Sequence, residues 1–207
     1  EAITWARQLA QPLSLAFALN WVGWLHQLRR EPRATQDQAE AAMALCTEQG
    51  FAQFLASGRL LRGWALATQH QGEDGIAHIH QGLAAYQATG AAVGRPQQVA
   101  LLAEVHGQVG QTEAGLAVLT EALTVVEQTG ERSYEAELHR LTGQLLLARS
   151  AAHHTEAETC FRRALDVAHH QQAKSWELRA AMSLSRLWQQ QGKHAAARRL
   201  LTEVYSW

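Results

Sequence analysis

The chain is poor in the residues that mark secreted, fibrous and disordered proteins. Its 207 residues include only two cysteines, three prolines and two methionines. Cys46 and Cys160 are too few for a disulfide framework, which fits a reduced, cytoplasmic compartment. Valine, isoleucine and threonine are sparse beside alanine, leucine, glutamine, glutamate and arginine. Because straight-chain residues lose little rotamer freedom in a helix, this composition predicts helices and no strands.

Neither a charge excess nor a long apolar run is present. The net charge is −1, so the chain has no general attraction to nucleic acid or anionic lipid. Apolar stretches such as residues 19–25 are interrupted by Asn20 and are far shorter than a membrane span. We therefore expect neither nucleic acid nor a membrane as a partner. No signal segment is visible, and the sequence starts with Glu1 instead of Met, so we expect a fragment of a longer chain.

Sequence patterns for catalysis are also missing. The glycines at positions 90 and 94 are not followed by the Gly-Lys-Ser/Thr of a phosphate-binding loop, and no serine lies in a Gly-x-Ser-x-Gly setting. The eleven histidines and two cysteines show neither His-Glu-x-x-His nor Cys-x-x-Cys spacing. We predict that the chain is not an enzyme, and that it has no catalytic residues, no metal site and no cofactor.

Two columns of small residues recur every 40 residues. The first consists of the glycines at positions 50, 90 and 130, which we predict to be left-handed caps at the C-terminal ends of helices. Members of the second column lie in the middle of apolar-periodic segments, where glycine costs up to ~1 kcal/mol relative to alanine and therefore needs a packing reason. That reason is the close approach of a neighbouring helix. The second column comprises Gly23, Gly63, Ala103, Gly143 and Ser183.

This periodicity predicts an all-α fold, an alpha-alpha superhelix of about five helix pairs with a repeat of roughly 40 residues. First helices are predicted at residues 12–30, 52–70, 95–109, 133–149 and 173–191, and second helices at 33–49, 73–89, 111–129, 154–170 and 193–206. The pairs cover approximately 11–50, 51–90, 91–130, 131–172 and 173–207 of a single repeat domain, and residues 1–10 end a preceding helix. A small insertion is expected near residues 150–154.

The second helices carry spacing similar to the tetratricopeptide (TPR) motif. Ala157, Phe161 and Ala164 occupy the spacing of its alanine, aromatic and alanine positions. We therefore predict a TPR-like solenoid with a partner-binding groove lined by the first helices. Taking the second small-residue column as the reference, the groove positions lie one residue after it, and three and six residues before it. They are Phe17, Asn20 and Trp24, then Ser57, Leu60 and Trp64, then Gln97, Ala100 and Glu104, then Glu137, Arg140 and Gln144.

Among these positions, our hypothesis is that Trp24 and Trp64 anchor an apolar partner segment. Aromatic residues and arginine are the usual anchors of protein interfaces. The alternative is that both tryptophans pack between successive repeats, since large aromatic residues are often part of a core. The polar residues predicted to orient the partner are Gln97, Glu104, Glu137, Arg140 and Gln144.

Several longer sequence segments resemble one known group of proteins. They include Thr-Gly-Glu-Arg at residues 129–132, Tyr-Glu-Ala-Glu-Leu-His-Arg-Leu at 134–141, Ala-Lys-Ser-Trp-Glu-Leu-Arg-Ala-Ala at 173–181 and Ser-Leu-Ser-Arg-Leu-Trp at 183–188. These segments resemble the C-terminal TPR region of bacterial multidomain signalling regulators. Such regulators carry a STAND-type NTPase module and often a class III adenylate/guanylate cyclase domain. The resemblance implies a parent protein that binds and hydrolyses ATP or makes a cyclic nucleotide, through residues that this chain lacks.

We therefore predict a sensor or protein–protein interaction scaffold of a larger cytoplasmic signalling protein. Its partner would be a protein or peptide, and the upstream module of the same polypeptide is one candidate. An alternative is a small effector or short peptide that binds in the groove and controls the upstream module. RNA binding is disfavoured by the neutral charge and the lack of a basic stripe.

Overall fold

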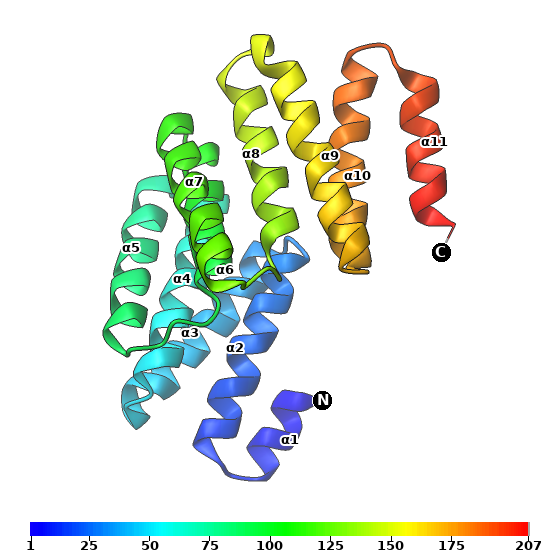
Figure 1. Ribbon diagram of the computed structural model, residues 1–207. Coiled ribbons are helices and arrows are strands. Elements are labelled where there is room, and N and C mark those ends of the chain that lie inside the picture. The colour runs from blue at the N-terminus through cyan, green and yellow to red at the C-terminus, as the bar shows by residue number, and fades with distance from the viewer. Residues whose placement is uncertain (207) are drawn as a thin grey trace. The chain divides into compact units, whose positions relative to one another are not determined.

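All regular structure within residues 1–206, the part of the chain that the structure describes, is helical. The structure is a computed structural model, shown in Figure 1. The first helices are α2 (Pro12–Leu28), α4 (Ala52–Thr68), α6 (Arg95–Gln108), α8 (Glu135–Arg149) and α10 (Lys174–Gln190). The second helices are α3 (Pro32–Gln49), α5 (Gly72–Ala88), α7 (Thr112–Thr129), α9 (His154–His170) and α11 (His194–Tyr205). A short helix, α1 (Ala2–Gln8), precedes them, and a 3-10 turn, η1 (Ala151–His153), lies where the insertion was expected.

Helix ends follow the local sequence. Pro12, Pro32 and Pro96 lie in the first turns of their helices, where the missing N–H of proline costs nothing. Gly50 and Gly130 cap α3 and α7 in the left-handed conformation, with φ of 74° and 72°. A side chain with a Cβ is strained in that conformation, so these two glycines end their helices as predicted.

The contacts divide the chain into two compact units. Unit 1 is Glu1–Val93 and holds α1 to α5, and unit 2 begins at Gly94 and holds α6 to α11. In each unit every helix packs against its neighbours along the chain, which makes a succession of antiparallel hairpins (Figure 1). The predicted TPR-like stack of helix pairs is therefore present in each unit. A single domain over residues 1–207 stays a prediction.

The small-residue column lies where helices approach closely. A Cβ built on Gly63 would lie 2.6 Å from the backbone oxygen of Gly75, between α4 and α5. A Cβ on Gly143 would lie 2.6 Å from the ring of Phe161, between α8 and α9. Real Cβ atoms do not tolerate such distances, so the hairpins depend on these glycines for their separation. The packing reason predicted for the column is confirmed at these two positions.

Candidate functional site

The first helices form the inner side of each unit. In unit 2, α6 contacts α8 and α8 contacts α10, whereas α7 and α9, and likewise α9 and α11, make no such contact within the described residues. Helices that approach one another on one side only must lie on the inside of a curve. We call the surface made by α6, α8 and α10 the first-helix face of unit 2. In unit 1, α2 and α4 are in contact in the same way.

A buried charged cluster lies on the first-helix face of unit 2. The side chains of Glu137 and Arg140 are only 3% and 5% exposed. Arg140 donates two hydrogen bonds to the Glu137 carboxylate, from Nε to Oε2 at 2.6 Å and from Nη2 to Oε1 at 2.8 Å. This bidentate geometry is the strongest arrangement of a guanidinium and a carboxylate, and it fixes both side chains on α8.

Helix α10 completes the cluster. Arg179 places Nη2 2.6 Å from Oε1 of Glu137, and Arg140 Nη1 lies 3.4 Å from the hydroxyl oxygen of Ser183. The Arg179 guanidinium also lies 5.3 Å from the ring centre of Trp176, which in turn packs edge-on against Tyr134 at 4.9 Å. Glu137 therefore binds an arginine from each of two neighbouring first helices and joins the two hairpins.

The charge of Arg140 is maintained despite its burial. Loss of water alone would lower the Arg140 pKa, but the hydrogen bonds and charge of Glu137, with a further contribution from Glu104 on α6, raise the pKa above its ordinary value. Arg140 therefore keeps its charge in this pair. It holds the side chains around it in one arrangement.

A small pocket opens beside this cluster. Its volume is about 240 Å³, and residues from α8, α9 and α10 line it. Gln144, Arg186 and Gln190 are exposed at its rim, whereas Phe161 is buried and forms part of its floor. No carboxylate of residues 1–206 lies within ion-pair distance of Arg186, which leaves this guanidinium available. The lining residues are Gln144, Leu147, Phe161, Ser183, Arg186, Leu187 and Gln190.

The structure brings together part of the predicted polar set. Glu137 and Arg140 are paired, Glu104 is near enough to affect the Arg140 pKa, and Gln144 lies at the pocket one turn further along α8. Gln97 lies near the start of α6, half-buried, and does not line the pocket. The sequence prediction missed Ser183, Arg186 and Gln190. Their spacing of i, i+3 and i+7 puts three polar residues on one side of α10, and this was the signal that could have revealed them.

The two predicted aromatic anchors lie in unit 1 and are buried. Trp64 has no exposed surface and Trp24 is 6% exposed. Trp24 donates a hydrogen bond from Nε1 to the hydroxyl oxygen of Ser57 at 3.1 Å, which connects α2 to α4. Because a side chain without exposed area offers a partner nothing to contact, the structure favours the alternative that both tryptophans pack between repeats.

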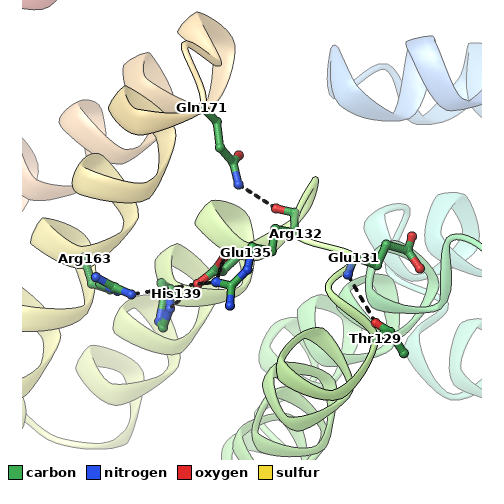
Figure 2. Close-up of polar contacts among 7 residues, drawn as sticks. All are labelled: Thr129, Glu131, Arg132, Glu135, His139, Arg163 and Gln171. Atoms are coloured by element: carbon green, nitrogen blue, oxygen red, sulfur yellow. Dashed lines mark hydrogen bonds and ion pairs between the residues drawn. The ribbon is translucent and has the colours of Figure 1, made fainter.

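A second polar cluster surrounds Glu135 at the start of α8. Arg132 Nη1 lies 3.2 and 2.9 Å from the two oxygens of the Glu135 carboxylate. Figure 2 shows Arg163 pointing from α9 toward Glu135, and Gln171 donating to the backbone oxygen of Arg132 at 2.8 Å. The adjoining pocket has a volume of about 360 Å³. Since Glu135 is satisfied by groups of its own hairpin, this cluster fixes the turn before α8.

His139 lies one helical turn after Glu135 on α8. Its Nε2 is 4.0 Å from Oε1 of Glu135, and its side chain is 19% exposed. Burial lowers the pKa of His139, and the nearby charge of Glu135 offsets this only in part. No group of three or more His, Cys, Asp or Glu side chains within residues 1–206 is placed to hold a metal ion. No helix in the same part of the chain is long and apolar enough to cross a membrane.

Comparisons with known proteins show what this geometry resembles. The Rap protein crystallised with Competence and Sporulation Factor superposes with a TM-score of 0.76 at 18% identity, over 96% of this chain and 55% of that one. Aspartyl phosphate phosphatase F from Bacillus subtilis gives a TM-score of 0.67 at 13% identity, over 94% of this chain and 49% of that one. A Podospora anserina kinesin light chain with TPR-like repeats gives 0.61 at 15% identity, covering 91% and 92% of the two chains. The fold is a TPR-like solenoid.

Comparisons of sequence give less information about the chain than the comparisons of structure. No protein-family model matches the chain. An uncharacterized protein of Rhizobium meliloti (strain 1021) is 30% identical over 128 residues, which are 62% of this chain and 12% of that protein. The chain thus spans about an eighth of the length of the curated relative that it matches. The predicted parent protein, with its NTPase or cyclase module, stays a prediction.

Proposed function

We propose that this chain is a protein-interaction scaffold and that the first-helix face of unit 2 binds an extended peptide segment with an acidic side chain. The observation that supports the proposal is the exposed, unpaired Arg186 at the rim of a pocket whose walls are fixed by the Glu137 cluster. A preorganised wall loses little entropy when a ligand binds, so the available contacts contribute more fully to affinity.

The size of the pocket limits what it accepts. At about 240 Å³ it lies below the roughly 300–1,000 Å³ of pockets that bury a drug-sized ligand. It has room for one or two side chains of a longer segment that continues along the face. This makes a small effector, the alternative function, the weaker candidate for this pocket.

The lining determines which side chains fit. The amides of Gln144 and Gln190 each offer donors and an acceptor, as the backbone of an extended peptide requires. Arg186 matches a carboxylate with two parallel hydrogen bonds. Leu147 and Phe161 supply an apolar floor for the stem of a glutamate or aspartate.

In the longer polypeptide such a face would serve as the sensing or interaction arm of a signalling protein. The Rap structure is a neighbour in fold that holds a bound factor, and this supports the proposal by analogy of fold. The acidic segment would come from a separate protein or from the upstream module.

A peptide array tests this function. The chain is probed with matched decapeptides that differ only in carrying Glu, Gln or Lys at one central position. We expect the Glu series to bind best, and Arg186→Glu to weaken that binding by roughly tenfold or more. Arg33→Glu on α3 is the matched control, because Arg33 is exposed but belongs to a second helix of unit 1. Equal binding of the three series, or wild-type affinity in Arg186→Glu, would overturn the proposal.

A further inference from the structure

An apolar stripe runs along the start of unit 1. On α2, Leu13, Phe17, Trp21 and Leu25 follow one another at four-residue spacing and are 51–55% exposed. Trp5 on α1, and Leu9 just after α1 in the turn that leads into α2, are also exposed, by 65% and 62%. Single exposed apolar residues are normal, but four large ones at helical spacing on one helix, with two more on the segment before it, are not. We call these six residues the N-terminal stripe.

The repeat shows what covers the same positions elsewhere. Forty residues after Phe17, Trp21 and Leu25, helix α4 carries Ser57, Leu61 and Ala65, which are 6%, 0% and 0% exposed. They are buried because α2 packs along α4. In unit 2 the same register gives Leu141 and Leu145 on α8, and Ala181 and Ser185 on α10, which are all buried. Leu145 packs on the preceding hairpin, since its side chain lies against Gly107 of α6 and Gly115 of α7.

One contact shows the detail of this packing. A Cβ on Gly23 of α2 would lie 2.9 Å from Cδ1 of Leu61, so the leucine side chain sits directly on the glycine of the preceding first helix. Trp21 is the residue that corresponds to Leu61 one repeat earlier. Its surface is therefore the surface that this fold uses to hold a preceding first helix.

Helix α1 occupies the position of the second helix to which such a preceding first helix would be joined. It spans only Ala2–Gln8, yet it packs on α2 in the place of a second helix. A second helix in this fold is joined to a first helix that lies beside the next first helix, as α2 lies beside α4. The curated relative is much longer than this chain, as a polypeptide with further helix pairs would be.

We propose that the N-terminal stripe is the docking surface for an amphipathic helix of the same polypeptide, the first helix of a pair whose second helix ends in α1. This helix takes against α2 the position that α2 takes against α4. Its contact face is apolar, and it carries a small residue opposite Trp21, because Leu61 requires one in Gly23.

Stacking of copies end to end does not account for the stripe. The exposed side of α11 carries the charged or polar side chains of His194, Arg198, Arg199, Thr202 and Glu203 beside Ala195, and charged groups are poor partners for an apolar stripe. The alternative that the experiment must distinguish is a symmetric dimer, in which the N-terminal stripes of two copies pack against each other.

The test compares the full natural polypeptide with residues 1–207. Hydrogen exchange is measured for residues 12–28, and light scattering gives the mass of each protein. We expect exchange in this segment to be slower by about tenfold or more in the full polypeptide, because a packed neighbour suppresses local opening. We also expect Trp21→Glu to remove that protection and to lower the melting temperature of the full polypeptide while leaving that of residues 1–207 nearly unchanged.

Two controls keep the result interpretable. Val93→Glu changes another exposed apolar residue, 78% exposed and outside the stripe, and should have no effect in either protein. Leu25→Gln is a milder variant of the stripe, for use if Trp21→Glu does not fold in the full polypeptide. Equal exchange in both proteins would overturn the proposal. So would a dimer of the full polypeptide that Trp21→Glu or Leu25→Gln dissociates, because the occupant would then be a second copy.

Discussion

Tryptophans three residues apart on α2 have opposite environments. Trp24 is 6% exposed and hydrogen-bonded to Ser57, whereas Trp21 is 52% exposed. Residues at i and i+3 lie on neighbouring parts of a helix surface, so a small rotation decides which of them enters the core. The repeat register assigned Trp24 to a groove. The packing of α2 on α4 encloses it instead.

Burial predicts a large energetic difference between first-helix tryptophans. Trp64→Ala removes a side chain with no exposed surface, so we expect the free energy of unfolding to fall by about 3–5 kcal/mol. Trp21→Ala removes a half-exposed ring and should cost less than about 1 kcal/mol. Urea unfolding of both variants measures the difference. Equal costs would show that Trp64 is not the packing residue that its burial implies.

His139 predicts a pH dependence of stability. Its pKa is lowered from 6.5 in the folded chain, chiefly by burial, so the unfolded chain binds the proton first as the pH falls. Stability due to this residue is therefore complete above the unfolded pKa and is lost as the pH falls below it. From about pH 7.5 to about pH 5.5, the urea midpoint of His139→Gln should drop less than that of wild type. His170→Gln, at an exposed position of α9, should behave like wild type.

At the scale of elements, α8 and α10 are joined by charge as well as by apolar packing. Arg140 on α8 and Arg179 on α10 both bind the Glu137 carboxylate, and the two helices are in contact. Bringing such charges out of water is costly, and the ion pair compensates only while every partner is present. The cluster therefore makes the spacing of these two helices specific.

Removing Glu137 and Arg140 together should cost less stability than the two single losses added together. We expect Glu137→Leu to lower the free energy of unfolding by about 3–5 kcal/mol, because Arg140 is left buried without its carboxylate. The double variant Glu137→Leu, Arg140→Leu should lose much less than the sum of the single variants. A double-mutant cycle from urea unfolding gives the coupling energy. Additive losses would mean that the two residues do not depend on each other for burial.

At the scale of the whole molecule, the sequence predicted the fold class better than it predicted which side chains are exposed. Gly50 occupies a left-handed cap and Gly143 a close approach between helices, and few other residues fit either position. Such glycines therefore allowed the helices and their pairing to be predicted from the sequence. Which side of a helix is covered depends on its neighbours. The sequence alone could not reveal that Trp64 is enclosed, that Glu137 binds Arg179 from another hairpin, or that Trp21 lacks a neighbour.

The division into two units predicts which fragments fold. Hairpins of a repeat array bury their apolar faces against adjacent hairpins, and each unit is compact by itself, so a cut inside a unit removes many of its native contacts. We expect a fragment from Gly94 onward to keep its helical circular dichroism and to unfold cooperatively in urea. A fragment that begins at Ala151 should fail, because it lacks α8, whose contacts bury Phe161 and Ala157. If both fragments melted without a cooperative transition, the stability of the repeats would depend on both units together.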